Sequence, residues 1–528
     1  MSQSYRLSNE GLLNRNKAIS FKFNGKKYTG YEGDTLASAL LANGIHLVGR
    51  SFKYHRPRGF FGAGVDEPNA KLQIQLNGHS EPNVNATEFE LVEGIEASSQ
   101  NCWPSVEFDV GAINNFLNRF FPAGFYYKTF MWPKSFWYKI YEPFIRKAAG
   151  LGVASIKKDK ERYEHKYEYC DLLVAGSGPA GLSSAYAAAK NGAKVILAED
   201  KPRFGGSLLT DDVTIDNLSG KAWTDKIITE LKEMPNVIIK NRSQVFGYYD
   251  HNMTVMFERT GDHLENKPKY TPRQRLWYIR AKEVLLSTGS IERPIVFGNN
   301  DTPGVFLSAA AKEYIKVYGV LVGKKPLIFT NNDSAYETAL EFKKNGIEPI
   351  ILDTRDEQLS ELIEAAKNQN IQIKFNYAVI AANGYKKVKS AQIGKLNKEG
   401  LTTGAIDKLS EEFESFPNLL PGPRKDDLGP VGGRTDQSFY DIKGDKAPVR
   451  SEEYIKSVFE SEVDKLTPPP NEDLSTITLP PIGGSEDMSP VAQAPAFSES
   501  SITTDEITGT DSGIPFIEVI SNPFLSIV

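Results

Sequence analysis

The sequence predicts an α/β fold: a Rossmann-like, two-dinucleotide-binding domain, preceded by a small β-grasp, ferredoxin-like domain and followed by a disordered tail. Three observations predict it. A glycine motif separates two apolar stretches at 170–200, a hairpin signal is followed by a short helix near the N-terminus, and Pro-rich acidic sequence replaces regular patterning after residue 400. We expect four regions, at 1–95, 96–167, 168–400 and 401–528.

The composition is that of an ordinary soluble protein. The 528 residues are 40% apolar and 24% charged. The net charge of −5 argues against a nucleic-acid binder, which would carry a basic excess. The first residues lack the apolar core of a secretion signal, and the most apolar stretch, 116–141, is too interrupted by charges and proline to span a bilayer. We expect a cytoplasmic protein with no nucleic-acid or membrane partner.

The first region, 1–95, has the pattern of a β-grasp domain. The segment FKFNGKKYTG (21–30) alternates around an Asn-Gly pair, which is a strong hairpin signal. LASALLANG (36–44) predicts a helix that begins after Asp34 or Thr35, either of which can cap it. A hairpin, a helix and then a long loop is the order found in plant-type ferredoxins.

The loop after this helix decides what we expect the domain to hold. In plant-type ferredoxins that loop carries cluster cysteines in C-x₄-C-x₂-C spacing. Here the loop, 49–70, has no cysteine, and the whole chain has only Cys102 and Cys170. We therefore expect no Fe–S cluster and a scaffold role for the domain. The loop does hold basic residues that either meet an anion such as a nucleotide phosphate or lie in solvent: Arg50, Lys53, His55, Arg56 and Arg58.

The second region, 96–167, is expected to be a helical connector rich in aromatic residues and interrupted by proline. Such a segment most simply packs against another domain or subunit. A direct role of its aromatic side chains in substrate binding is the alternative.

The third region holds the motif that predicts chemistry. In CDLLVAGSGPAGLSSAYAAAKNGAKVILAED (170–200), an apolar strand runs into Gly176, Gly178 and Gly181 in G-x-G-x-x-G spacing, and a helix and a second strand follow. The glycines permit the tight turn, the approach of the pyrophosphate and the close packing of helix on strand. Glu199 ends the second strand, where a carboxylate accepts ribose hydroxyls and repels a 2′-phosphate. This favours NAD or FAD over NADP.

Residues beside these positions complete the predicted cofactor site. Two further segments approach the same nucleotide, the glycine-containing turn after Glu199 and the strand-to-loop junction at 282–305. The expected cofactor-binding residues, besides the three glycines and Glu199, are Ser177, Pro179, Ala180, Asp200, Arg203, Gly206, Ser207, Thr288 and Gly289.

A second strand–turn–helix–strand unit follows at 325–355. Its turn, 330–335, lacks the G-x-G-x-x-G glycines, so a structural half is a better interpretation than a second bound nucleotide. From 402 the sequence lacks regular periodicity, and we expect 402–528 to be mostly disordered, with one amphipathic helix at 452–466.

Several stretches together resemble one family. Residues 1–400 resemble the N-terminal part of the α subunit of heterotetrameric sarcosine oxidase. The resemblance rests on SFKYHRPRGFFGAG (51–64), DEPNA (66–70), GSGPAGL (176–182), FGYYDHN (246–252), STGSIERPIVFGNNDTPGV (287–305) and TNNDSAYETAL (330–340).

The resemblance implies a function and a set of partners. It implies an α subunit that holds NAD at Gly176, Gly178, Gly181 and Glu199 without using it as a redox substrate. A flavin-bearing β subunit, together with smaller subunits, would oxidise the small amine sarcosine to glycine. Family α subunits continue into a folate-binding, aminomethyltransferase-like domain, whereas here the resemblance stops near residue 400. We therefore expect this chain to be inactive alone.

Two other functions stay open. One is a self-contained FAD-dependent NAD(P)H reductase, against which the missing second glycine motif and the absent C-x-x-C pair argue. The other is a non-catalytic remnant that binds a partner through 96–160. No catalytic residue is nominated by the sequence, and no metal site is expected.

Overall fold

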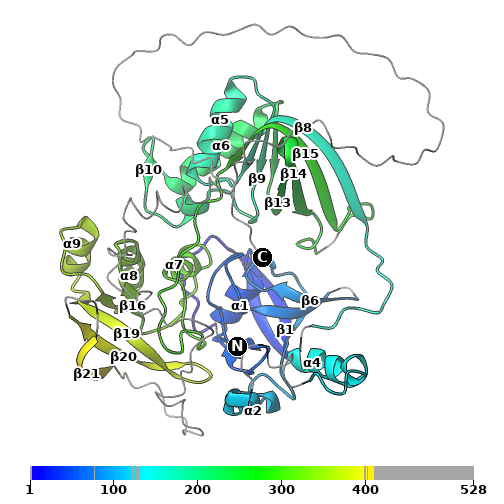
Figure 1. Cartoon of the computed structure of the whole chain (residues 1–528). Coiled ribbons are helices and arrows are strands. Elements are labelled where there is room, and N and C mark those ends of the chain that lie inside the picture. Colours follow the sequence, from blue (N-terminus) through cyan, green and yellow to red (C-terminus); the bar gives the residue numbers. More distant parts are fainter. Residues whose placement is uncertain are drawn as a thin grey trace, which may run out of the picture. The chain divides into compact units, whose positions relative to one another are not determined.

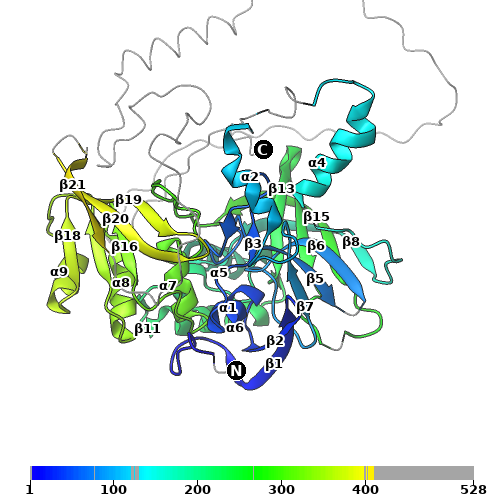
Figure 2. The ribbon, with the colours of Figure 1, turned by 90° about the horizontal axis from the view of Figure 1, so that it is seen from below.

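The computed structural model describes residues 3–409, except for positions 77, 121–123, 125–129, 151, 266, 398–399 and 401. The chain divides into two units, 1–449 and 450–528, and the described residues all belong to the first unit. Figures 1 and 2 show this unit from two directions. In the part of the chain that the structure describes, no helix is both long enough and apolar enough to cross a membrane.

The N-terminal module is a five-stranded sheet with one buried helix. The sheet order is β2-β1-β7-β5-β6, and a two-stranded ribbon, β3-β4, lies beyond the helix. The elements are β1 (Asn14–Phe23), β2 (Lys26–Glu32), α1 (Leu36–Ala42), β3 (Gly49–Arg50), β4 (Pro57–Arg58), β5 (Lys71–Leu76), β6 (His79–Asn85) and β7 (Glu96–Ser99). Because β7 pairs with both β1 and β5, the module continues past the predicted end at residue 95.

Local sequence explains the first hairpin and the first helix. Asn24 and Gly25 both have positive φ, at 47° and 77°, as a two-residue hairpin turn requires. The Thr35 side chain accepts from the backbone N–H of Ser38, and the Ser38 hydroxyl accepts from the N–H of Thr35. This reciprocal capping box fixes the start of α1, so the predicted hairpin and helix are confirmed.

The described residues of the connector form short helices. They are η1 (Val110–Ala112), α2 (Ile113–Phe116), η2 (Asn118–Phe120), the π-helix η3 (Trp137–Tyr141) and α4 (Glu142–Ala149). In both views α2 and α4 lie at the same end of the N-terminal module (Figures 1 and 2).

The dinucleotide-type half is built on a six-stranded sheet in the order β12-β9-β8-β15-β14-β13. Strands β12, β9, β8 and β15 are parallel, whereas β15, β14 and β13 form an antiparallel meander. Helices α5 and α6 lie together on one side of it (Figure 1). The elements are β8 (Tyr163–Ala175), α5 (Pro179–Lys190), β9 (Val195–Ala198), η4 (Gly206–Leu209), β10 (Thr214–Ile215), β11 (Leu218–Ser219), α6 (Gly220–Glu233), β12 (Val237–Lys240), β13 (Ser243–Tyr249), η5 (Asp250–Asn252), β14 (Met253–Arg259) and β15 (Gln274–Leu286).

The second half has a parallel three-stranded sheet and a separate antiparallel meander. Its elements are α7 (Ser308–Lys316), β16 (Leu327–Thr330), α8 (Ser334–Lys344), β17 (Ile350–Asp353), α9 (Glu361–Asn368), β18 (Gln372–Phe375), β19 (Tyr377–Gly384), β20 (Val388–Leu396) and β21 (Thr402–Leu409). Strand β21 pairs with β20, so regular structure extends past the boundary expected at residue 400. The rest of the predicted tail, including the helix at 452–466, lies outside the described residues.

One apolar core joins the N-terminal module to the second half. Phe21 and Leu40 of the module belong to the same buried cluster as Tyr314 of α7, and Tyr336 and Phe342 of α8. The two regions therefore share one continuous hydrophobic core.

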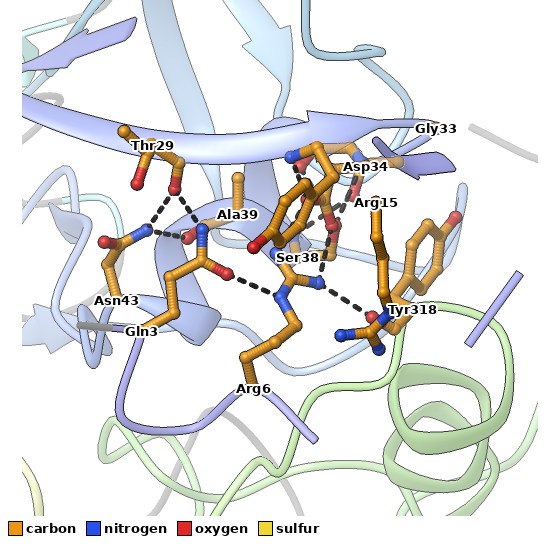
Figure 3. A network of polar contacts seen from close by, with 12 residues as sticks. Gln3, Arg6, Arg15, Thr29, Gly33, Asp34, Ser38, Ala39, Asn43 and Tyr318 are labelled. Atoms are coloured by element: carbon orange, nitrogen blue, oxygen red, sulfur yellow. Dashed lines mark hydrogen bonds and ion pairs between the residues drawn. The ribbon is translucent and has the colours of Figure 1, made fainter. Parts of the chain in front are cut away.

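An N-terminal arm, residues 3–13, is held between these two regions. The N–H of Tyr5 donates to Ala42 at the end of α1 (3.2 Å), and the N–H of Leu7 donates to the carbonyl of Gly319 (2.8 Å). Figure 3 shows the Arg6 guanidinium paired with both oxygens of Asp34, at 3.0 and 2.7 Å, while it also donates to the carbonyl of Tyr318 at 2.7 Å. One buried ion pair thus ties the arm, the module and the end of α7.

Candidate dinucleotide-binding site

The first glycine loop connects β8 to α5, and two of its glycines are needed for close packing. A Cβ on Gly176 would lie 2.2 Å from the carbonyl oxygen of Ser287, and a Cβ on Gly181 would lie 1.9 Å from that of Gly176. Gly176 also has φ of +100°. Both positions therefore exclude any side chain.

Gly178 differs from its two neighbours in the motif. It caps the start of α5 in an extended conformation (φ −69°, ψ −174°), which any residue adopts. A Cβ added there would meet nothing within 4 Å. The missing side chain of Gly178 thus leaves open space in front of the helix N-terminus, where Pro179 and Ala180 are exposed.

The start of α5 has the properties of an anion site. The N-cap is a glycine, so it offers no capping side chain, and the first turn contains no acidic residue. The first backbone N–H groups of a helix lack intrahelical acceptors and carry a partial positive charge. A pyrophosphate fits such a terminus, and a glycine at the cap lets it approach.

A second glycine turn packs directly onto the first loop. The N–H of Gly205 donates to the carbonyl of Ser177 (3.1 Å), and Gly205 has φ of +120°. A Cβ on Gly206 would lie 3.0 Å from the Cα of Gly178. Gly206 and Ser207 are exposed beside the start of α5, so the structure brings these two predicted residues next to the motif.

The third approach comes from the end of β15. The N–H of Ser287 donates to the carbonyl of Ala175 (2.8 Å), which extends the parallel pairing of β15 and β8 by one step. Thr288 and Gly289 follow and are exposed. The contact between Ser287 and Gly176 had no distinct sequence signal, because any small residue after the strand would fit the pattern.

Glu199 is placed at the end of β9, and its carboxylate is buried against the glycine loop. Its Oε2 accepts from the N–H of Ser177 at 3.0 Å and from the Ser177 hydroxyl, and its Oε1 accepts from the N–H of Lys201 at 3.0 Å. The residue is 6% exposed. Glu199 therefore holds the turn in shape, and the remaining lone pairs of its carboxylate are the groups that a ribose hydroxyl would use.

Burial raises the pKa of Glu199 to about 7, and the adjacent Asp200 carboxylate adds to the effect. The folded pKa lies above the ordinary glutamate value of about 4.3, so this group stabilises the fold fully below about pH 4 and the contribution is lost as pH rises through about 7. We expect Glu199→Gln to flatten the stability profile of the nucleotide-free chain between about pH 4.5 and 7.5, measured as urea midpoints. The exposed Glu233→Gln should leave the profile unchanged. Identical profiles for all three chains would show that Glu199 does not titrate in this range.

Arg203 and Asp200 are placed differently from the glycines. The Arg203 guanidinium donates to the carbonyls of Leu12 (3.2 Å) and Gly33 (3.1 Å) and lies 5.7 Å from the ring centroid of Tyr318. It therefore links the glycine turn to the N-terminal arm and module. The carbonyl of Asp200 accepts from Arg259 (2.9 Å), while its carboxylate acts on the pKa of Glu199.

Lys201 was missed by sequence reasoning, although it connects the site to the second half. Its ammonium group lies 2.7 Å from Glu313 of α7, and that carboxylate raises the pKa of Lys201 against the opposing effect of burial. A lysine after an acidic residue has no distinctive sequence signal, so only the structure identifies this pair.

In the second half, the turn before α8 and the acid at the end of β17 form hydrogen bonds within the chain. In its turn, the Asn332 side chain accepts from the N–H of Ser334 (3.0 Å) at the start of α8. Asp353, at the end of β17, is fully buried and accepts from the Tyr336 hydroxyl (2.8 Å) and from Arg355 (3.0 Å). Asp353 is thus held within the chain as Glu199 is, whereas the start of α8 differs from that of α5 because a side chain of the chain itself accepts from its N–H.

The basic loop of the N-terminal module is likewise engaged by the chain itself. Arg50 is buried and donates to the carbonyl of Val106 (2.9 Å), and Arg56 and Arg58 both pair with Asp301. These guanidinium groups fix the loop to its neighbours. Neither alternative predicted for them, an anion site or a solvated loop, describes them.

Comparisons with known proteins agree with this geometry. Residues 170–405 match the model of the pyridine nucleotide-disulphide oxidoreductase family. Sarcosine oxidase subunit alpha of Rhizobium meliloti (strain 1021) is 51% identical over 353 residues, 67% of this chain and 36% of that protein. The same subunit of Corynebacterium sp. (strain U-96) is 32% identical over 348 residues, 65% of this chain and 31% of that protein. Over about two thirds of its length, the chain is similar to sarcosine oxidase subunit alpha.

The homology has a defined extent. The chain spans about a third of the length of these sarcosine oxidase subunits, and it matches their N-terminal part. Among solved structures, L-proline dehydrogenase from P.horikoshii has a TM-score of 0.48 and 20% identity over 77% of this chain and 61% of that chain. The predicted fold class, a ferredoxin-like module followed by a dinucleotide-binding α/β domain, is confirmed.

One expectation about cofactors was wrong. Residues 16–102 match the model of a 2Fe-2S iron-sulfur cluster binding domain, so the expectation that this subunit homologue has no Fe–S cluster is corrected by its domain family. A ferredoxin cluster takes four cysteine thiolates, whereas the matched segment contains one cysteine, Cys102. These residues do not fit a cluster held by cysteines alone.

Proposed function

We propose that the chain is the dinucleotide-binding part of an α-type subunit in an oxidase complex that converts sarcosine to glycine. The substrate in this proposal is a small secondary amine, oxidised at a CH–NH bond by a flavin-bearing β subunit that works with smaller subunits. The names of the homologous subunits and the oxidoreductase family support this class. In this proposal the chain alone does not catalyse the oxidation.

The observation that carries the proposal is the empty space at Gly178. Three separate segments, at 176–181, 205–207 and 287–289, meet around the N-terminus of α5. Gly178 and Gly289 both face open space there, but Gly289 has positive φ (+70°), whereas the backbone of Gly178 suits any residue. Packing requires Gly176 and Gly181 in any fold of this kind, whereas a glycine at the cap is required only if something approaches it.

The residues of the site would hold NAD, with FAD as the alternative. The amides at the start of α5 would bind the pyrophosphate, and Glu199 would accept from ribose hydroxyls. A bound dinucleotide supplies a group that accepts or donates hydride; the work of this chain is to bind and orient it. The start of α8, where Asn332 accepts from the N–H of Ser334, favours a single nucleotide, which disfavours a reductase that passes hydride between two.

The first experiment is an absorption spectrum of the purified chain, followed by mass spectrometry of the nucleotide released on denaturation. A colourless chain that releases NAD is the expected result. A yellow chain that releases FAD would favour the self-contained reductase, and a chain that releases no nucleotide and binds neither in titration would contradict the proposal.

The variant Gly178→Ala tests the site itself. Its backbone conformation is allowed for alanine and its Cβ meets no atom of the chain, so the melting temperature should stay unchanged. The methyl group would stand where the pyrophosphate approaches, so we expect nucleotide affinity to fall by at least about tenfold, roughly 1.4 kcal/mol. Gly323→Ala, which also meets nothing within 4 Å, is the matched control. Equal affinity in both variants would place the nucleotide elsewhere.

A further inference from the structure

The connector exposes more large apolar side chains than a solvated surface needs. We call the described residues among 103–156, which leave out 121–123, 125–129 and 151, the aromatic segment. Its exposed fractions reach 82% at Trp132, 80% at Phe116 and 70% at Phe144. Scattered apolar residues are ordinary on a surface, but a run of them within one segment marks an interaction site.

The exposed area is that of a protein interface. Six aromatic side chains of the segment are 70–82% exposed: Trp103, Phe108, Phe116, Trp132, Tyr138 and Phe144. An aromatic side chain buries about 150–250 Å², so these six alone leave on the order of 700–1,100 Å² to cover, compared with about 800 Å² from one partner in a standard interface.

The charges of the segment indicate what covers it. Among residues 130–150 there are four basic side chains, Lys134, Lys139, Arg146 and Lys147, and one carboxylate, Glu142. Arg146 pairs with Glu142 at 2.8 Å, which leaves the three lysines as the excess charge. The whole chain has a net charge of −5, so this basic excess is local. A segment with exposed aromatic side chains and a basic excess is complementary to a face that carries apolar and acidic side chains.

We propose that the aromatic segment is the docking surface for a second, different polypeptide of the oxidase complex, one whose contact face carries apolar and acidic side chains. The homologous proteins are named as subunits, which requires at least one other chain in their complexes. This inference rests on the proposed function for the identity of the complex, but it concerns a surface separate from the nucleotide site.

The test uses the full chain and the recombinant remaining subunits of the Rhizobium meliloti sarcosine oxidase, whose subunit alpha is 51% identical. We expect a complex by sedimentation velocity, and we expect Trp132→Ala/Phe144→Ala to weaken it by at least about tenfold. Tyr270→Ala, an equally exposed aromatic outside the segment (72%), is the matched control and should bind like the unsubstituted chain.

Charge gives a second readout. Lys134→Glu/Lys139→Glu should slow association and reduce its dependence on salt, because rim charges act mainly on the rate of encounter. Nucleotide content, measured on the same samples, should be equal in all variants. If the unsubstituted chain bound no nucleotide, the proposed function would be contradicted. The docking proposal would still be decided by the binding of the aromatic variant.

Three results would overturn the docking proposal. They are no complex with the unsubstituted chain, a complex that the aromatic variant forms equally well, and a change of occupant. The occupant would be a second copy if the chain alone dimerised and the variant did not. It would be a lipid surface if the chain bound phosphatidylserine vesicles and not the subunits, and if the aromatic variant did not bind the vesicles.

Discussion

Gly181→Ala is expected to destabilise the chain by about 3 kcal/mol or more, at the upper end of overpacking effects, and to abolish nucleotide binding. The added Cβ would lie 1.9 Å from the backbone oxygen of Gly176, and backbone cannot rotate away as a side chain does. Helix α5 must then move away from β8, which separates the three segments that meet around Gly178. Thermal melting and nucleotide titration measure the two effects.

The controls separate steric from conformational effects of alanine. Gly323→Ala has open space and should melt like the unsubstituted chain, and Gly178→Ala should lose nucleotide without losing stability. A Gly181→Ala chain with an unchanged melting temperature would mean that α5 and β8 are not packed as closely as described.

Asp34→Ala is expected to cost about 3–5 kcal/mol, because it leaves the Arg6 guanidinium buried without its carboxylate. The side chains of Arg6 and Asp34 are 5% and 0% exposed. Asp34 also accepts from the Ser38 hydroxyl (2.6 Å) and the N–H of Tyr31 (2.9 Å), so several donors lose their acceptor at once (Figure 3). Urea unfolding measures the loss.

The exposed pair of Lys17 with Glu32, at 2.9 Å, supplies the comparison. Glu32→Ala removes the same kind of charge at the surface and should leave the urea midpoint within experimental error, because water screens exposed pairs. The double variant Arg6→Met/Asp34→Leu should recover much of the loss, because no charge then stays buried alone. If Asp34→Ala and Glu32→Ala were equally mild, the arm would not depend on this ion pair.

The sequence predicted the features that depend on neighbours along the chain. The hairpin at Asn24-Gly25 and the cap at Thr35 need only local geometry, and the glycine spacing of 176–181 is fixed by one turn. The meanders of β13–β15 and β19–β21 were not predicted, because such pairing depends on partners that periodicity alone does not specify. For the same reason β7 was assigned outside the module to whose sheet it belongs.

Long side chains were the main difficulty at the site. Arg203 precedes the second glycine turn, so sequence placed it near the phosphates, yet its guanidinium bonds to carbonyls 191 and 170 residues away. The basic loop at 50–58 shows the same effect, since Arg56 reaches Asp301. A glycine acts where its backbone lies, so its place could be predicted from the motif. The guanidinium group of an arginine lies far from its own backbone, so its partners could not be predicted.

The N-terminal arm has a consequence for biosynthesis. Arg6 donates to the carbonyl of Tyr318, 312 residues further along the chain. At translation rates of about 5–20 residues per second, the arm emerges roughly 15 to 60 seconds before the residues that enclose it. During that interval the arm can bond to Asp34 and Ala42 of the module, but its hydrogen bonds to Tyr318 and Gly319 cannot form. One side of the enclosure around the arm is therefore missing until the chain has been synthesised past residue 319.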